Sequence, residues 1–87
     1  MPRIEKTVVV KGKQGLHARP AAMFVQIANK FTSSVTVRKS GEEVNGKSIM
    51  GILMMGADRY TELTLIVDGE DADQSFRELE AFLAKEE

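Results

Sequence analysis

Residues 15–21 read Gly15-Leu16-His17-Ala18-Arg19-Pro20-Ala21 and contain the only histidine in the chain. A valine-rich run, Thr7–Val10, comes before them, and apolar residues with the i, i+3, i+4, i+7 spacing of one helix face follow at Phe24, Ile27, Ala28 and Phe31. Proline is tolerated in the first turn of a helix, because the amide hydrogen it lacks would have no partner there. We therefore predict a strand followed by a helix from about Ala18 to about Lys30. His17 should lie at or just before its first residue.

The predicted start of this helix is also a candidate anion site. The first amides of a helix have no acceptor within it, and the helix dipole adds partial positive charge. Phosphate commonly binds there. The donors would be the amides of Ala18 and Arg19 together with the Arg19 guanidinium. Because neutral imidazole is a nucleophile near pH 7, His17 is a candidate phosphoryl acceptor. The residues alone leave open a plainer interpretation, in which His17 is only a cap or a surface side chain.

Two stretches resemble the same protein family. Residues 15–21 resemble the active-site signature of HPr, the histidine-containing phosphocarrier of the bacterial phosphoenolpyruvate:sugar phosphotransferase system. Lys47-Ser48-Ile49-Met50-Gly51-Ile52-Leu53 resembles its serine site, and the separation of the two motifs and the chain length also match. By residue matching, the resemblance implies that His17 is phosphorylated on Nδ1. It also implies that Arg19 binds the phosphate and that Ser48 is a regulatory phosphorylation site.

The resemblance further implies a carrier with no turnover of its own, and it implies no cofactor and no metal. Enzyme I, charged by phosphoenolpyruvate, would phosphorylate His17, and A-type sugar-specific components would take the phosphoryl group onward. An HPr kinase/phosphorylase would act on Ser48. Phosphate there would weaken the encounter with Enzyme I and create a surface for a transcriptional regulator. The alternative for Ser48 is a plain helix cap.

Composition predicts one small domain, residues 1–87, with a modest core. Of its residues 43% are hydrophobic and 29% charged, as in an ordinary globular protein. The chain has no cysteine, which excludes disulfides and thiolate metal sites and, with a single histidine, leaves little basis for structural zinc. The charged N-terminus has no apolar stretch, and no run is long enough to span a bilayer. We therefore expect a cytoplasmic protein, and we expect it to be a monomer.

The charges are distributed unevenly along the chain. Residues 1–50 carry nine Lys or Arg against three acids, whereas residues 51–87 carry three against ten. Lys11, Lys13 and Arg19 lie close to His17 in sequence. Positive charge around the histidine should steer phosphorylated or acidic partner surfaces toward it.

The remaining elements follow from alternation and turn residues. We predict strands at 4–10, 35–38, 42–44 and 63–67, separated by turns at Ser40-Gly41 and Asn45-Gly46. Ser48 should cap a short second helix. The acidic segment 68–73 opens a last helix with Phe76, Leu79 and Leu83 on one face, and we interpret its acids as capping residues. Strands with one apolar face need one covering layer, which indicates an α+β sandwich. The resemblance implies a four-stranded antiparallel sheet covered on one face by three helices.

The segment 49–55 is apolar on every side, so it is either buried or an exposed surface for partners. Methionine suits such a surface because its thioether adapts to several partner shapes. By residue matching, Ile49, Met50 and Leu53 resemble the docking patch of the family.

Two rival functions are weighed against the carrier. Gly12-Lys13-Gln14-Gly15 is a G-x-x-G, the loop with which KH domains clamp a nucleic-acid backbone. That loop belongs between two helices, whereas this one follows a strand, so we expect no nucleic-acid partner. A paralogue of a nitrogen-related phosphotransferase chain would use the same His17 chemistry with other partners, and the serine motif favours the sugar or carbon-control branch.

Overall fold

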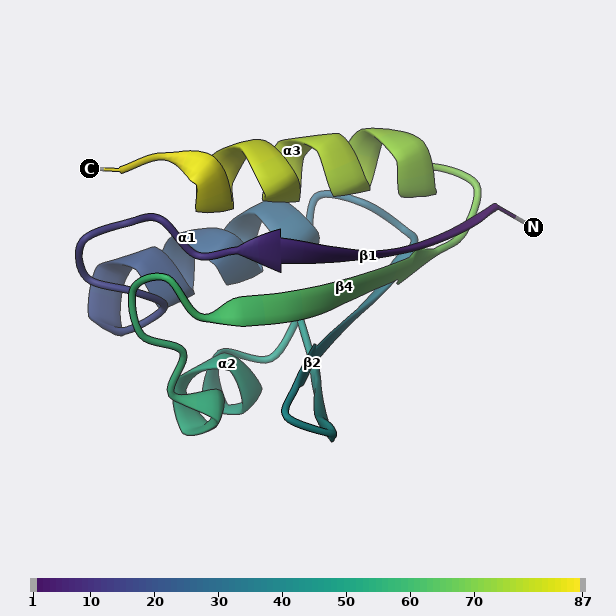
Figure 1. Ribbon diagram of the computed structural model, residues 1–87. Helices are drawn as coiled ribbons and strands as arrows, with labels where there is room; N and C mark the ends of the chain where they lie inside the picture. The colour runs from purple at the N-terminus through teal and green to yellow at the C-terminus, as the bar shows by residue number, and fades with distance from the viewer. Residues whose placement is uncertain (1, 87) are drawn as a thin grey trace.

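The computed structural model describes residues 2–86, and its elements follow the predicted order. They are β1 (Arg3–Val9), α1 (Ala18–Ala28), β2 (Ser34–Lys39), β3 (Glu42–Asn45), α2 (Ile49–Met55), β4 (Glu62–Asp68) and α3 (Ala72–Ala84). The strands form one antiparallel sheet in the order β1-β4-β2-β3, and the three helices leave its other face open (Figure 1). The predicted open-faced sandwich is confirmed.

The sheet topology determines which loops become neighbours. β4 lies between β1 and β2, and its pairing with β1 runs from Arg3 opposite Asp68 to Val9 opposite Glu62. The end of β1 therefore meets the start of β4. The loop that leads into α1 and the loop that follows α2 consequently lie side by side, at the same end of the paired strands β1 and β4.

Alternate strand residues face the helices and form the core. Of the two alternations possible in the first strand, the inward one contains Val8 and Val10, which are buried. β4 contributes Leu63, Leu65 and Val67 in the same way. From the helices come Phe24 of α1, Ile52 of α2, and Phe76 and Leu79 of α3, among others. Since α2 contributes a single buried residue, most of its apolar surface lies outside the core.

The first helix ends at Ala28 rather than at Lys30, so the predicted boundary is wrong by two residues. The amides of Lys30 and Phe31 bond to carbonyls three residues back, at 3.1 and 3.4 Å, which tightens the chain out of the α-helix. The Asn29 amide group donates to the Val25 carbonyl at 2.9 Å and to the Lys47 carbonyl at 3.2 Å. The end of α1 is therefore fixed to the residue that precedes Ser48.

Asp71 occupies the N-cap position of α3 but does not cap it with its side chain, so the capping interpretation is wrong for this residue. Its carboxylate instead accepts hydrogen bonds from the amides of Thr32 and Ser33, both at 2.9 Å, and from their hydroxyls. The Ser33 hydroxyl and the Thr32 amide are the main reasons that the pKa of Asp71 is lowered to about 2. Asp73, in the first helical turn, remains favourably placed for the dipole.

Candidate functional site

His17 is the N-cap residue of α1, as the sequence predicts. Its backbone is extended, with φ −118° and ψ 159°, and its side chain forms no capping hydrogen bond. The next residue, Ala18, has a φ of 49°, a conformation that costs an L-residue free energy and that is a frequent feature of functional sites. The chain therefore bends sharply at the histidine, and the imidazole is available to neighbours outside the helix.

The start of α1 leaves backbone amides without acceptors among residues 2–86. The first bond at this end joins the Ala21 amide to the His17 carbonyl at 3.5 Å. No residue in the described part of the chain accepts a hydrogen bond from the amide of Ala18 or Arg19, and Ala18 is exposed. Pro20 has no amide hydrogen to offer. Two backbone donors at exposed residues that directly follow His17 thus lack acceptors among residues 2–86, and the anion site predicted there stays a prediction.

The loop of residues 10–17, which carries His17, is bonded to the loop of residues 56–61. The Leu16 amide donates to the Ala57 carbonyl at 2.8 Å, and the Val10 amide donates to the Thr61 carbonyl at 2.9 Å. Gly15 has a φ of 63°, and a Cβ there would lie 2.4 Å from the Ala57 oxygen. Only glycine fits this close approach, so the position of the His17 loop depends on the loop that follows α2.

The second loop supplies the only hydrogen-bond partner of the imidazole among residues 2–86. His17 Nε2 lies 2.9 Å from Asp58 Oδ1, and the two side chains are 43% and 83% exposed. Nδ1 forms no hydrogen bond to any described residue. Asp58 is not among the residues that the sequence singles out, because it lies 41 positions from His17 and no local pattern joins the two. The antiparallel pairing of β1 with β4, which exists only in the folded sheet, brings the two loops together.

Arg19 is exposed, and its guanidinium forms no hydrogen bond with His17. It borders a cleft of about 400 Å³ between the start of α1 and the end of α3. The apolar wall of this cleft comes from Val10, Leu16, Pro20, Met23, Phe82 and Leu83, and its polar lining includes Gln14 and Lys85. No ion pair or side-chain hydrogen bond to the described residues holds Arg19 in place. Its guanidinium is therefore free to reach an anion at the helix start.

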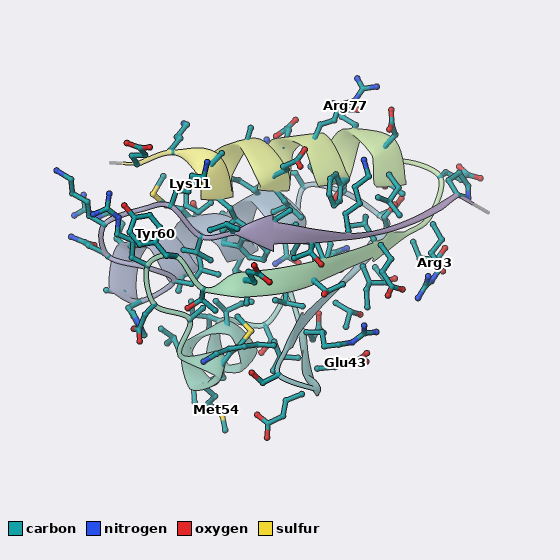
Figure 2. The ribbon with its side chains drawn as sticks, viewed as in Figure 1. Arg3, Lys11, Glu43, Met54, Tyr60 and Arg77 are labelled. Carbon is teal, nitrogen blue, oxygen red and sulfur yellow. The ribbon has the colours of Figure 1, made fainter. Side chains whose placement is uncertain are left out.

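Several cations gather at this end of the molecule, and we call them the cationic cluster: Lys11, Lys13, Arg19, Arg59 and Lys85. The Arg59 Nε donates to the Lys11 carbonyl at 3.3 Å, and the Lys11 amide donates to the Leu83 carbonyl at 2.9 Å, near Lys85. None of the five forms an ion pair with a residue in the range 2–86. Figure 2 shows Lys11 and Tyr60 at the same end of the molecule. An anionic partner would thus meet unpaired positive charge around His17.

Ser48 caps α2, as the sequence predicts, since its Oγ accepts a hydrogen bond from the Gly51 amide at 3.1 Å. The bond between Asn29 and the Lys47 carbonyl places Ser48 near the C-terminal end of α1, whereas His17 lies at its N-terminal end. The 11 residues of α1 separate them, a helix length of roughly 16 Å at the usual rise per residue. The structure therefore does not bring the two candidate phosphorylation sites together.

The candidate docking residues are on the surface. Ile49, Met50 and Leu53 are exposed by 38%, 61% and 39%, and Met54 by 78%. In Figure 2, Met54 points away from the body of the protein. Sequence analysis names the first three and misses Met54 and Met23, which is 43% exposed on α1. Of the two interpretations of segment 49–55, the structure favours the exposed surface, with only Ile52 buried.

The fold and the site define a class of protein: an open-faced α+β sandwich with a histidine at the exposed start of its first helix. Comparison with known families agrees, because residues 4–85 match the model described as "PTS HPr component phosphorylation site". The chain belongs to the HPr family of phosphocarrier proteins.

Known relatives cover nearly the whole chain. The HPr-like protein Crh of Halalkalibacterium halodurans is 48% identical over 95% of this chain and 99% of its own. The crystal structure of the phosphocarrier protein HPr from Bacillus anthracis superimposes with a TM-score of 0.91 at 41% identity, covering 93% of this chain and 96% of that one. Bacillus subtilis Crh, at 47% identity, a TM-score of 0.77 and 95% coverage of both chains, is described as an intertwined dimer with a swapping domain.

These findings fix the general function. HPr-family proteins are phosphocarriers rather than enzymes, and family membership implies partners in the phosphotransferase system. Because a relative is known as a dimer, the expected monomer remains a prediction. Among residues 2–86, no helix has the length and apolar character needed to cross a bilayer.

Proposed function

We propose that this chain, acting in the cytoplasm as one phosphocarrier domain, accepts a phosphoryl group on His17 Nδ1 from phospho-Enzyme I. It then passes the group to A-type components of the sugar phosphotransferase system. The observation that carries this proposal is the arrangement at the start of α1. Nε2 faces Asp58, while Nδ1 forms no hydrogen bond to residues 2–86. The next two residues, Ala18 and Arg19, are exposed and begin the helix.

The chemistry requires few groups from this side. The Nδ1 lone pair forms a bond to phosphorus as the bond from phosphorus to the donor breaks. The forming bond and the breaking bond lie roughly in line. The amides of Ala18 and Arg19 and the Arg19 guanidinium would stabilise charge on the equatorial oxygens. On transfer to the acceptor, the phosphorus–nitrogen bond breaks and its electron pair returns to Nδ1. An exposed site suits this sequence, because two different partners must reach the same atom.

The surface around the histidine supports the proposed partners. Ile49, Met50 and Leu53 offer apolar contact, and the cationic cluster offers charge to acidic partner surfaces. Met23 and Met54 extend the apolar contact to α1 and to the end of α2. We propose that this surface binds Enzyme I and the A-type components in turn.

Intact-mass analysis after incubation with Enzyme I, magnesium and phosphoenolpyruvate tests the proposal. The wild-type chain should gain one acid-labile phosphoryl group, His17→Ala should gain none, and Ser48→Ala should gain it as the wild type does. Arg19→Ala should be phosphorylated about tenfold more slowly, as expected for one lost charge-assisted contact in a solvent-exposed site. No gain with an Enzyme I that phosphorylates another carrier would contradict the sugar branch and favour the nitrogen-related one.

A second function is favoured by the relatives named Crh, one of which is described as a catabolite repression protein. We propose that an HPr kinase/phosphorylase phosphorylates Ser48, which weakens binding of Enzyme I and forms a surface for a transcriptional regulator. The phosphate would add about −1.5 to −2 charges beside the exposed residues of α2. Incubation with such a kinase and ATP should add one acid-stable phosphate that is absent from Ser48→Ala. Its absence from the wild type would leave Ser48 as a helix cap.

A further inference from the structure

We propose that Asp58 is a positioning residue for phosphoryl transfer: its carboxylate keeps the imidazole proton of His17 on Nε2 and so presents the Nδ1 lone pair to phosphorus. This inference rests on the proposed function and deepens it. It assigns a role to a residue 41 positions away in the chain, on a different loop from the histidine.

The position of Asp58 is set by the backbone on both sides of it. Gly56 ends α2 in the left-handed conformation, with φ 65°, and the following Ala57 is fully buried. The Ala57 carbonyl accepts from the Leu16 amide at 2.8 Å, and the Tyr60 amide donates to the Val10 carbonyl at 2.5 Å. Tyr60 itself has a φ of 70°, a strained value for an aromatic residue. The loop is thus bonded to the His17 loop immediately before and after Asp58.

No described cation competes with His17 for this carboxylate. The neighbouring Arg59 guanidinium lies 4.6 Å from the centre of the Tyr60 ring, and its Nε donates to the Lys11 carbonyl. Within residues 2–86, the sole hydrogen bond of the Asp58 side chain is the one to His17 Nε2. Its charge and its acceptor capacity are therefore directed to the imidazole.

This contact determines the state of the ring. An ionised carboxylate can only accept hydrogen bonds, so the nitrogen that faces it must carry the proton. A neutral imidazole carries one N–H, which leaves the lone pair on Nδ1. When Nδ1 bonds to phosphorus, the Nε2 proton stays in place and the ring becomes cationic beside the Asp58 carboxylate. When the phosphorus–nitrogen bond breaks, the electron pair returns to Nδ1. Neither direction needs a proton transfer.

If the pair between Asp58 and His17 were purely structural, replacing Asp58 would have different effects. Pairs with this much exposure contribute little to stability, so replacing Asp58 should hardly change the thermal midpoint. A structural role would also leave the protonation of the ring nitrogens and the phosphorylation rate unchanged. A positioning role would appear in the ring nitrogens and in the phosphorylation rate, with stability unchanged.

The test compares the full-length wild type with Asp58→Ala, Asp58→Asn and Glu80→Ala. Asn keeps the size of Asp58 but can present either an acceptor or a donor to Nε2, so it removes the preference for one tautomer. Glu80 is an exposed acid on α3 that forms no ion pair or hydrogen bond with the side chain of any described residue, and its removal deletes the same charge. Two measurements are made: the ¹⁵N chemical shifts of the His17 ring at about pH 8.5, where an ordinary imidazole is neutral, and the rate of phosphorylation by phosphoramidate.

We expect wild-type Nε2 to show the shift of a protonated nitrogen and Nδ1 that of an unprotonated one. In both Asp58 variants the shifts should move toward those of the urea-unfolded chain, and phosphorylation should slow about two- to fivefold, the range set by an exposed pair. Glu80→Ala should behave as the wild type. Unchanged shifts and rates in folded Asp58→Ala and Asp58→Asn would overturn the inference.

Failure of this inference is distinguishable from failure of the proposed function. Phosphoramidate transfers its phosphoryl group directly and releases ammonia, so neither measurement uses Enzyme I. If the wild type takes no phosphoryl group from Enzyme I, the proposed function fails while the ring shifts still report on Asp58. If Enzyme I phosphorylates the wild type and the Asp58 variants equally and the ring shifts agree, only the role of Asp58 is rejected.

Discussion

Asp71 shows what one carboxylate can do at the scale of a residue. It joins the segment after α1 to the start of α3, and it gives the buried Ser33 hydroxyl an acceptor. The same bonds lower the pKa of Asp71 to about 2 from an ordinary value of 3.8. A proton therefore binds the unfolded chain more readily than the folded one. The stabilisation by Asp71 is complete above about pH 4 and is lost as the pH falls toward the folded value.

We predict that Asp71→Asn lowers the thermal midpoint at neutral pH and flattens its decline between about pH 4 and pH 2. Thermal unfolding followed by circular dichroism across this range measures both effects. Flattening should be partial, because the pKa of Glu5 is also lowered, mainly by its hydrogen bond with Arg3. Glu80→Gln is the matched control and should retain the wild-type slope. If the thermal midpoints of Asp71→Asn and wild type fell in parallel between about pH 4 and pH 2, Asp71 would not be a source of the loss of stability in acid.

At the scale of an element, α2 depends on its ends more than a longer helix would. It has seven residues, and a helix this short is not stable alone. Ile52 is buried in the core and the half-buried Met55 packs against it, while Ser48 caps the start of the helix and Gly56 closes its end. The end of the same helix leads to Asp58, so α2 connects Ser48 with the loop that contacts His17.

We predict that Ser48→Ala lowers the free energy of unfolding by about 1 kcal/mol, the usual value of an N-cap. Ser48→Asp should retain most of that stability, because a carboxylate can accept from the Gly51 amide and suits the helix dipole. Urea titration of the three proteins measures the difference. Equal losses in both variants would show that the hydroxyl has a role other than capping.

In the whole molecule, cations without an ion pair to residues 2–86 gather at one end, where Arg59 and Lys85 from the acidic half of the sequence join Lys11, Lys13 and Arg19. The cationic cluster lies at the end that carries His17, whereas most other cations are paired: Arg3, Lys30, Arg38 and Arg77. Long-range attraction between exposed charges is screened by salt. Association with an acidic partner surface should therefore be fast at low ionic strength and slower as salt is added.

We predict that kcat/KM for phosphorylation by Enzyme I falls about tenfold between low salt and about 0.5 M sodium chloride. Lys13→Gln and Lys85→Gln should lower the low-salt value and reduce the dependence on salt. Lys30→Gln removes the same charge from the opposite end of α1, where Lys30 pairs with Glu78, and should keep the wild-type dependence. Identical salt profiles for all three variants would contradict steering by the cationic cluster.

Local sequence signals were sufficient to predict the order of the elements and the residues at the starts of α1 and α2. Helix and strand periodicity, Pro20 in a first turn and a serine before an apolar run are local signals, so the order of elements, the N-cap position of His17 and the Ser48 cap were predictable. The end of α1 was not, because it depends on Asn29 bonding to Lys47 in another segment.

The contacts between residues far apart in the sequence depend on the tertiary structure. Asp58 reaches His17 because β1 pairs with β4, and Asp71 binds Thr32 and Ser33 instead of capping its own helix. The exposed apolar residues of α2 also depend on the tertiary structure, because a sequence that is apolar on every side of a helix does not indicate which face is buried. The physical reason is the range of the interactions. Capping and periodicity act over a few residues, whereas these contacts exist only after the sheet has brought its loops together.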